Sequence, residues 1–248
     1  MQPEMKPVRT DPRGQEQGFG RGSSYEPVQD VAYSTPESQK VLRNTYMLLA
    51  LTMVPTVIGA YIGMATGSII MASPIISSLV MLAAVIGLQF AIAANRNNAL
   101  GIGLLLLMTG VLGWWLGPIL NVALSMKNGI ALVGYAAVGT GIVFFTMGAL
   151  AQTIKRDLSF MGKFLFVGMI ALLVAMIANM FLQIPALALT ISTLVIVVFS
   201  LFLLYDLQRI IRGGETNYIM ATTGVYMSLF NIFANLLQLL GIFGGERD

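Results

Sequence analysis

Side chains that could do chemistry gather near the C-terminus, in two long apolar stretches. Asp206 lies at the end of the first stretch and is followed by Arg209, Arg212 and Glu215. The second stretch carries uncharged hydrogen-bonding side chains, at Ser228, Asn231, Asn235 and Gln238. A polar group in lipid is costly without a partner, so these side chains should face other helices. We therefore expect the last helix to lie in the middle of a helix bundle.

Two roles for Asp206 are open on residue types alone. In the first, Asp206 is a carboxylate at a helix end that Arg209 and Arg212 neutralise from the next turn. In the second, Asp206 is a latch that ties its helix to the last helix through Ser228 or a neighbouring polar group such as Asn231. A carboxylate near the membrane edge with a basic partner stays ionised, whereas one that faces a hydroxyl in a dry core tends to hold its proton.

The residue inventory excludes most intramembrane chemistry. The chain contains no histidine and no cysteine, which removes Ser-His and Cys-His catalysis, histidine-ligated zinc and thiolate metal sites. An aspartyl protease needs two membrane carboxylates, and Asp206 is alone. A retinal protein needs a lysine inside a late span, and no span contains one. We expect no enzymatic activity, no metal and no cofactor.

The composition is that of an integral membrane protein. Of 248 residues, 56% are hydrophobic and only 10% are charged, and the mean hydropathy is +0.81. A soluble chain has about a quarter charged residues, so this one cannot cover a surface that faces water. A nucleic-acid partner is not expected, and the lipid bilayer is.

Seven apolar segments follow one another, each near the roughly 20 residues that a helix needs to cross a bilayer. They predict an all-α fold with spans at Tyr46–Thr66, Ile75–Ala94, Leu100–Leu120, Ile130–Thr153, Phe164–Gln183, Ala186–Tyr205 and Tyr218–Phe243. Glycines within the third and fourth spans, at 101, 103, 110, 113, 134, 139 and 141, are expected to allow close approach between helices.

The first 38 residues are a separate region in this interpretation. They hold five prolines, four glycines and scattered charges of both signs, and too few apolar residues to build a core. We expect a disordered cytoplasmic tail at 1–38 and a transmembrane domain at 39–248. Thr35 and Pro36 look like a helix start, with Thr35 as the N-cap and Pro36 at the first helical position.

The basic residues predict the orientation in the membrane. With the N-terminus in the cytoplasm, 12 of the 14 lysines and arginines lie inside, and only Lys127 and Arg247 lie outside. The opposite orientation places the excess outside. The sequence therefore favours a cytoplasmic N-terminus and a periplasmic C-terminus.

Several motifs occur in an order that resembles a known family. They are KVLRNTYMLLALT at 40–52, GWWLGPILN at 113–121, RDLSFMG at 156–162, ANMFLQIPAL at 178–187, YDLQRIIRGGETNYI at 205–219 and SLFNIFANLLQLLG at 228–241. The chain resembles the Bax inhibitor-1 family, most closely its bacterial YccA-like branch. The resemblance covers nearly everything after the tail and implies seven helices, six of which surround the seventh.

The resemblance also implies where a gate would lie. Family members are described as leaks for calcium or protons, with a gate at a pair of aspartates. Asp206 matches the first, in the YDL motif, and Ser228 stands where the second would fall. An arginine at the cytoplasmic end of the second helix is associated with the gate, and Arg96 lies at that end here. Because one carboxylate with a serine cannot share a proton as two carboxylates do, this substitution weakens the leak hypothesis.

Two functions follow as hypotheses. The first is a bacterial inner-membrane regulator of the membrane-anchored AAA protease FtsH, which acts by contact and presents its cytoplasmic tail; the YccA-like branch is associated with this role. The alternative is a pH-sensitive calcium or proton leak channel gated at Asp206. A leak needs a continuous polar path, whereas a regulator needs only an exposed surface and a tail.

Overall fold

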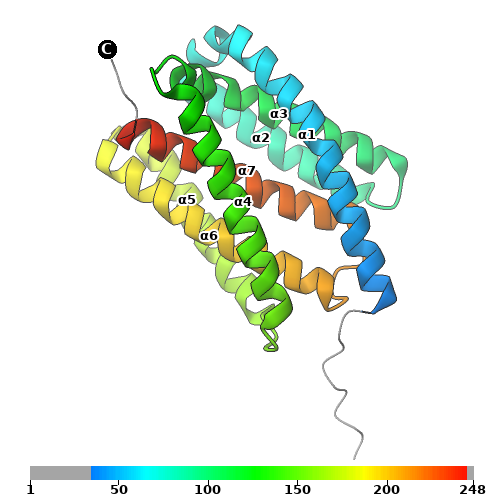
Figure 1. Ribbon diagram of the computed structural model, residues 1–248. Helices are drawn as coiled ribbons and strands as arrows, with labels where there is room; N and C mark the ends of the chain where they lie inside the picture. The colour runs from blue at the N-terminus through cyan, green and yellow to red at the C-terminus, as the bar shows by residue number, and fades with distance from the viewer. Residues whose placement is uncertain (1–34, 245–248) are drawn as a thin grey trace, which may run out of the picture. The chain divides into compact units, whose positions relative to one another are not determined.

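A computed structural model describes residues 35–244. In this part of the chain it contains seven α-helices, each long and apolar enough to cross a membrane (Figure 1). They are α1 Pro36–Met71, α2 Pro74–Ala94, α3 Ala99–Leu124, α4 Gly129–Thr153, α5 Ser159–Leu182, α6 Pro185–Ile211 and α7 Tyr218–Phe243. The predicted number, order and type of the elements are confirmed.

The helices extend beyond the apolar segments that predicted them. α1 begins at Pro36, before the predicted span that starts at Tyr46, and α6 ends at Ile211, after the predicted span that ends at Tyr205. Backbone hydrogen bonds do not depend on side-chain polarity, so a helix continues through polar residues until a breaker stops it. Asp206 therefore lies within α6, more than one turn before its end.

The predicted start of α1 is confirmed in detail. Thr35 is extended and its side chain accepts a hydrogen bond from the backbone N–H of Ser38 at 3.2 Å, with Pro36 in the first turn. This cap satisfies one of the free N–H groups of the first turn. Of the predicted tail, residues 1–34 lie outside the described residues, and residues 36–38 form the first turn of α1.

The outer surface of the bundle is apolar. In the most apolar window of each helix, the buried share runs from 11% in α5 to 39% in α3. Large apolar side chains such as Ile130, Phe90 and Phe164 are 84%, 74% and 75% exposed. A soluble monomer rarely exposes a contiguous apolar surface of this extent, and hydrocarbon is the solvent that suits it.

Glycines bring α1 and α3 into backbone contact. A Cβ added at Gly59 would overlap the carbonyl of Gly110, and one added at Gly117 would overlap the backbone of Gly63. Gly113 likewise faces the carbonyl of Thr56. Small residues spaced four apart let helix backbones approach in this way, and dispersion between the backbones then holds them together.

The expectation for the other glycines is partly wrong. A Cβ at Gly103, Gly134 or Gly141 would meet no heavy atom within 4 Å, so these glycines are not packing positions. The glycines of α1 that meet α3, Gly59 and Gly63, were missed. Spacing alone cannot separate the two sets, because a glycine on the lipid face and one on a helix contact have the same local sequence.

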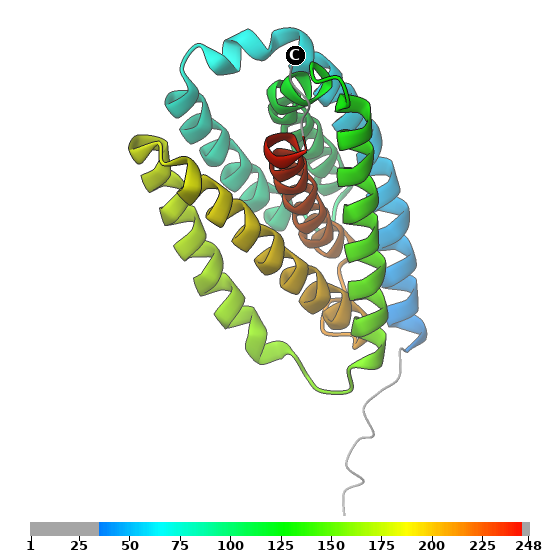
Figure 2. The same cartoon turned by 60° about the vertical axis from the view of Figure 1, so that its left-hand side comes forward.

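α7 lies among several neighbours. It packs against α1, α2, α3, α4 and α6, whereas α5 packs mainly against α6. Figure 2 shows α7, from orange to red, among the ribbons of these helices. Its Tyr226 is 1% exposed and its hydroxyl lies 2.8 Å from that of Thr56 on α1. The stricter expectation, that all six helices surround α7, stays a prediction because it also requires α5.

Candidate functional site

Asp206 lies on α6 against a glycine of α7. The residue is half-buried, between the fully buried Leu203 and Leu207. A Cβ added at Gly224 would come within 2.7 Å of Oδ2 of Asp206. The missing side chain of Gly224 therefore leaves the space that the carboxylate occupies. Within residues 35–244 the carboxylate makes no hydrogen bond and no ion pair.

Ser228 is not the residue that meets Asp206. It lies one turn beyond Gly224 on α7 and is 2% exposed. In the described part of the chain no hydrogen bond joins Ser228 to Asp206. The structure thus brings α6 and α7 together at Asp206, but through Gly224. The family-derived position of Ser228 did not indicate this, because a one-turn difference along α7 depends on the axial offset of the two helices.

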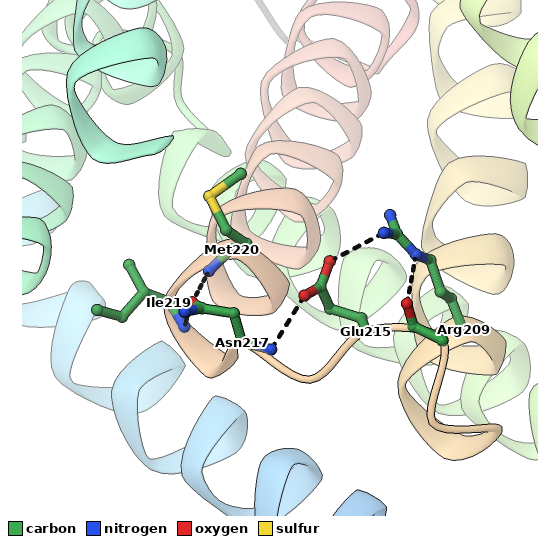
Figure 3. A network of polar contacts seen from close by, with 6 residues as sticks. Arg209, Glu215, Asn217, Ile219 and Met220 are labelled. Carbon is green, nitrogen blue, oxygen red and sulfur yellow. Dashed lines mark hydrogen bonds and ion pairs between the residues drawn. The ribbon is translucent and has the colours of Figure 1, made fainter. Parts of the chain in front are cut away.

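Arg209 turns toward the α6–α7 connection instead of toward Asp206. Its guanidinium forms an ion pair with Glu215 at 3.2 Å, and its Nε donates to the carbonyl of Gly214 at 3.2 Å (Figure 3). The Arg209 side chain is 46% exposed, so this pair contributes little to stability. Arg209 therefore makes no direct bond to Asp206, although its charge still acts on that carboxylate through space, and the choice between the two roles of Asp206 stays a prediction.

Asn217 joins two connections at this end of the bundle. Its Oδ1 accepts hydrogen bonds from the backbone N–H groups of Ile219 and Met220, which caps α7 (Figure 3). Its Nδ2 donates to the carbonyl of Arg96 at 2.8 Å and to the side-chain oxygen of Asn97 at 3.0 Å. Arg96 thus contributes its backbone carbonyl here, while its residue surface is exposed. The α2–α3 and α6–α7 connections are held together by one amide.

Gln208 is a buried residue that anchors the α4–α5 connection, and the sequence analysis missed it. It is 2% exposed, and its Oε1 accepts the backbone N–H of Leu158 at 3.0 Å. Its Nε2 donates to the carbonyls of Ile154 and Arg156 at 3.2 and 3.0 Å. One side chain therefore holds the α4–α5 connection against α6. The helical period could have indicated this position, because Gln208 lies four residues after Leu204 and therefore on the same buried face of α6.

Arg212 supports the same connection. Its guanidinium donates from Nη2 to the carbonyl of Ile154 at 2.9 Å. That carbonyl ends α4 and has lost its helical partner, so a charged donor near the helix C-terminus satisfies it favourably. The predicted site residues Arg209 and Arg212 thus anchor two different connections, and neither contacts Asp206 directly.

Asn231 lies on a cavity farther along α7. A cavity of about 420 Å³ lies between α2, α3, α5, α6 and α7. Its polar lining consists of Ser78, Asn179, Ser192, Asn231, Asn235 and Gln238. The amides of Asn231 and Asn235 donate to the carbonyls of Met227 and Asn231 on their own helix, at 2.8 Å each. Within the described residues no hydrogen bond uses their side-chain oxygens, and polar side chains from four helices line this cavity.

Chemically, the site offers one carboxylate and several neutral dipoles. Among the described residues no group of three or more histidine, cysteine, aspartate or glutamate side chains could hold a metal ion. A single carboxylate can bind a proton or one cation transiently, and amide oxygens can replace part of a hydration shell. Among the described residues, these polar side chains hold the helices and their connections together.

Comparisons with known proteins identify the family of this chain and several similar proteins. A family model described as inhibitor of apoptosis-promoting Bax1 matches residues 38–245. The chain belongs to the Bax inhibitor-1 family. This match reaches from the first turns of α1 to the end of α7, so the family resemblance stated from the motifs is confirmed.

Proteins of several bacteria are similar to this chain over most of their length. YccA of Escherichia coli K12, named modulator of FtsH protease, is 43% identical over 211 residues, which cover 85% of this chain and 93% of that protein. An uncharacterised membrane protein of Vibrio cholerae is 42% identical over 208 residues, which cover 84% of this chain and 92% of that protein. In E. coli O6:H1 the similar protein is named inner membrane protein YccA, at 43% identity over 211 residues.

Proposed function

We propose that this protein is a multi-pass protein of the bacterial inner membrane that modulates a membrane-anchored AAA protease of the FtsH type by contact. The 43% identity to a protein named modulator of FtsH protease, over 85% of this chain, carries the proposal. α5 supports it. This helix packs mainly against α6, and only 11% of its apolar window is buried, so most of its surface is open to a partner within the membrane.

Reconstitution with the protease tests this function. We reconstitute the purified protein in one bilayer with FtsH and measure the degradation rate of a membrane substrate. When the concentration of this protein equals its Kd for the protease, half of the protease is occupied, and the degradation rate is expected to change by about twofold. An unrelated seven-helix protein at the same concentration is the control for crowding. A degradation rate that does not respond to this protein at any concentration would refute the proposal.

Removal of residues 1–34 is expected to lengthen the lifetime of the protein in cells that contain the protease. The reason is that a AAA protease starts degradation by pulling on a tail of the kind that the composition of residues 1–34 predicts. The deletion leaves Thr35 in place to cap α1. Pulse-chase measurement in cells checks the lifetime, and thermal unfolding in detergent checks that the bundle is unchanged. Equal lifetimes of the two chains would remove the tail from the mechanism and leave contact through the bundle.

We also propose that the N-terminus is cytoplasmic and the C-terminus periplasmic. The excess of lysine and arginine at one end of the helices supports this orientation. A reporter that is active only in the periplasm, fused after Asp248, is expected to be active, whereas the same reporter in the connection between α4 and α5 is expected to be silent. The reverse pattern would invert the orientation.

The alternative function, a calcium or proton leak gated at Asp206, has an observation in its favour. Asp206 has no hydrogen bond or ion pair in the described chain and lies at the α6–α7 contact, and the cavity lined by amides lies farther along the same pair of helices. A carboxylate that closes a path by charge would lose that ability when neutralised.

Asp206→Asn is expected to raise cation flux several-fold in liposomes, or to remove its pH dependence, if the leak exists. The amide keeps the size of the side chain and removes the charge beside Gly224. Glu37→Gln removes an exposed carboxylate on the first turn of α1 and is the matched control. Flux like that of the wild type across the pH range in Asp206→Asn would dismiss the gate.

A further inference from the structure

A small polar pocket lies where the α4–α5 connection meets the C-terminal end of α6. Its volume is about 230 Å³. It is lined by Asp157, Ser159, Tyr205, Gln208, Arg209, Arg212 and Gly214. Two of these side chains are guanidinium groups and two carry hydroxyls. Neither the regulator nor the leak hypothesis uses this pocket.

The surroundings of the pocket are basic. The α4–α5 connection, the start of α5, the end of α6 and the α6–α7 connection carry five basic side chains and three acidic ones. These are Lys155, Arg156, Lys163, Arg209 and Arg212, with Asp157, Asp206 and Glu215. Glu215 is already paired with Arg209 at 3.2 Å. A positive potential therefore remains at this end of α5 and α6, outside the apolar spans.

Donors remain free inside the pocket. Arg212 donates once, to the carbonyl of Ile154, although a guanidinium has five N–H donors. The hydroxyl of Tyr205 lies over Gly162, where an added Cβ would come within 2.8 Å of it. Within residues 35–244 that hydroxyl makes no hydrogen bond. The planar guanidinium of Arg212 and the phenolic hydroxyl of Tyr205 are together suited to bind an oxyanion with several acceptor oxygens.

Asp157 is a carboxylate that lies at the pocket and is bound by hydrogen bonds. Its Oδ1 accepts hydrogen bonds from the hydroxyl and the backbone N–H of Ser159, at 2.6 and 2.9 Å. These bonds, with a smaller contribution from the charge of Arg212, hold the pKa of Asp157 below its ordinary value. The carboxylate is thus ionised at neutral pH, and its negative charge near Arg212 opposes the binding of another anion there.

The position of the pocket favours a lipid headgroup over a soluble anion as its ligand. The pocket lies where the α4–α5 connection meets the ends of α5 and α6, two helices long and apolar enough to cross a membrane. This end of the spans lies at the level of the lipid headgroups. A basic pocket between helices at this level is where an anionic headgroup binds, with its acyl chains along the apolar helices below.

We propose that the pocket formed by Tyr205, Arg209 and Arg212 binds the phosphate of an anionic phospholipid. The phosphate oxygens accept hydrogen bonds from the two guanidinium groups and from the Tyr205 hydroxyl. The acyl chains lie along the apolar surfaces of α5 and α6. The bound headgroup would join the ends of α5 and α6, and anionic lipid content would then influence how firmly α5 is held.

Titration in a neutral detergent tests the site without a charged bilayer. Short-chain phosphatidylglycerol is added to the full-length protein, and the bound lipid is counted by native mass spectrometry. Arg212→Gln is expected to lower the affinity about tenfold, because a charge-assisted hydrogen bond is lost, and Tyr205→Phe about threefold. Asp157→Asn is expected to raise the affinity about fivefold, since it removes the competing carboxylate.

Matched controls separate this site from general charge and from folding. Arg43→Gln removes one exposed positive charge on α1, away from the pocket, and should leave the affinity unchanged. If Arg212→Gln unfolds the protein, the opposite shifts of Tyr205→Phe and Asp157→Asn still decide the matter. Short-chain phosphatidylcholine and inorganic phosphate should not compete.

Three results would overturn the proposal. One is equal affinity for phosphatidylcholine, which has no net charge. Another is competition by inorganic phosphate at the same concentration as the lipid, which would assign the pocket to a soluble anion. The third is an unchanged affinity in both Tyr205→Phe and Asp157→Asn.

Discussion

Replacement of Gly117 by valine is expected to destabilise the bundle by about 3 kcal/mol, at the upper end of what overpacking of a close contact causes. A Cβ at Gly117 would overlap the backbone of Gly63. A flexible side chain could move away, but here the obstacle is a helix backbone. α1 and α3 would have to separate, with loss of the contact between them.

The α1–α3 contact also holds polar bonds that separation would break. The indole N–H of Trp114 donates to the hydroxyl of Thr66 at 2.8 Å. The amide of Asn121 donates to the carbonyl of Met64 at 2.6 Å. Both bonds lie within about a turn of Gly117, so its substitution should weaken packing and hydrogen bonding together.

Gly103→Val is the matched control for Gly117→Val. It makes the same change on the same helix, at a position where an added Cβ meets no heavy atom within 4 Å. Unfolding in detergent, followed by circular dichroism while SDS is added, measures both variants against the wild type. Equal stability of the two variants would contradict a backbone contact between α1 and α3 at this position.

The second large effect is expected for Gln208→Leu, a loss of about 3 kcal/mol, because buried polar groups left without partners cost about 1–3 kcal/mol each. Leucine keeps a similar volume and leaves the Leu158 N–H and the Arg156 carbonyl without their partner. The Ile154 carbonyl is expected to keep its bond from Arg212. The α4–α5 connection should therefore open at one end.

Hydrogen exchange separates this local effect from general destabilisation. In Gln208→Leu the Leu158 amide should exchange much faster, while amides of α3 exchange as in the wild type. Gln89→Leu is the control, since Gln89 lies exposed on α2 and no hydrogen bond of its side chain is present in the described residues. Unchanged protection of the Leu158 amide would show that Gln208 does not hold this connection.

The two variants test contacts that serve different purposes. Gly117 lies in the α1–α3 contact, which does not involve α5 or α6. Gln208 holds the connection that leads into α5, the helix with the fewest neighbours. If α5 is where a protease partner or a lipid acts, Gln208→Leu should alter that response, whereas moderate weakening of the α1–α3 contact should not.

The sequence by itself determined the class of the protein, the number and order of its helices, and its family. Hydrophobicity acts residue by residue, so a run of about 20 apolar residues predicts a span without knowledge of its neighbours. Local rules likewise predicted the cap at Thr35. The motifs from Lys40 to Gly241 indicated the family that the match over residues 38–245 confirmed.

Only the tertiary structure decided which side chains meet. It placed Gly224 and not Ser228 against Asp206, paired Arg209 with Glu215, and made Gln208 the anchor of the α4–α5 connection. The helical period tells which residues share a face, but the axial offset and crossing of two helices decide which residues touch. A shift of one turn, about 5.4 Å, exchanges one partner for another, and no local pattern in the sequence encodes that shift.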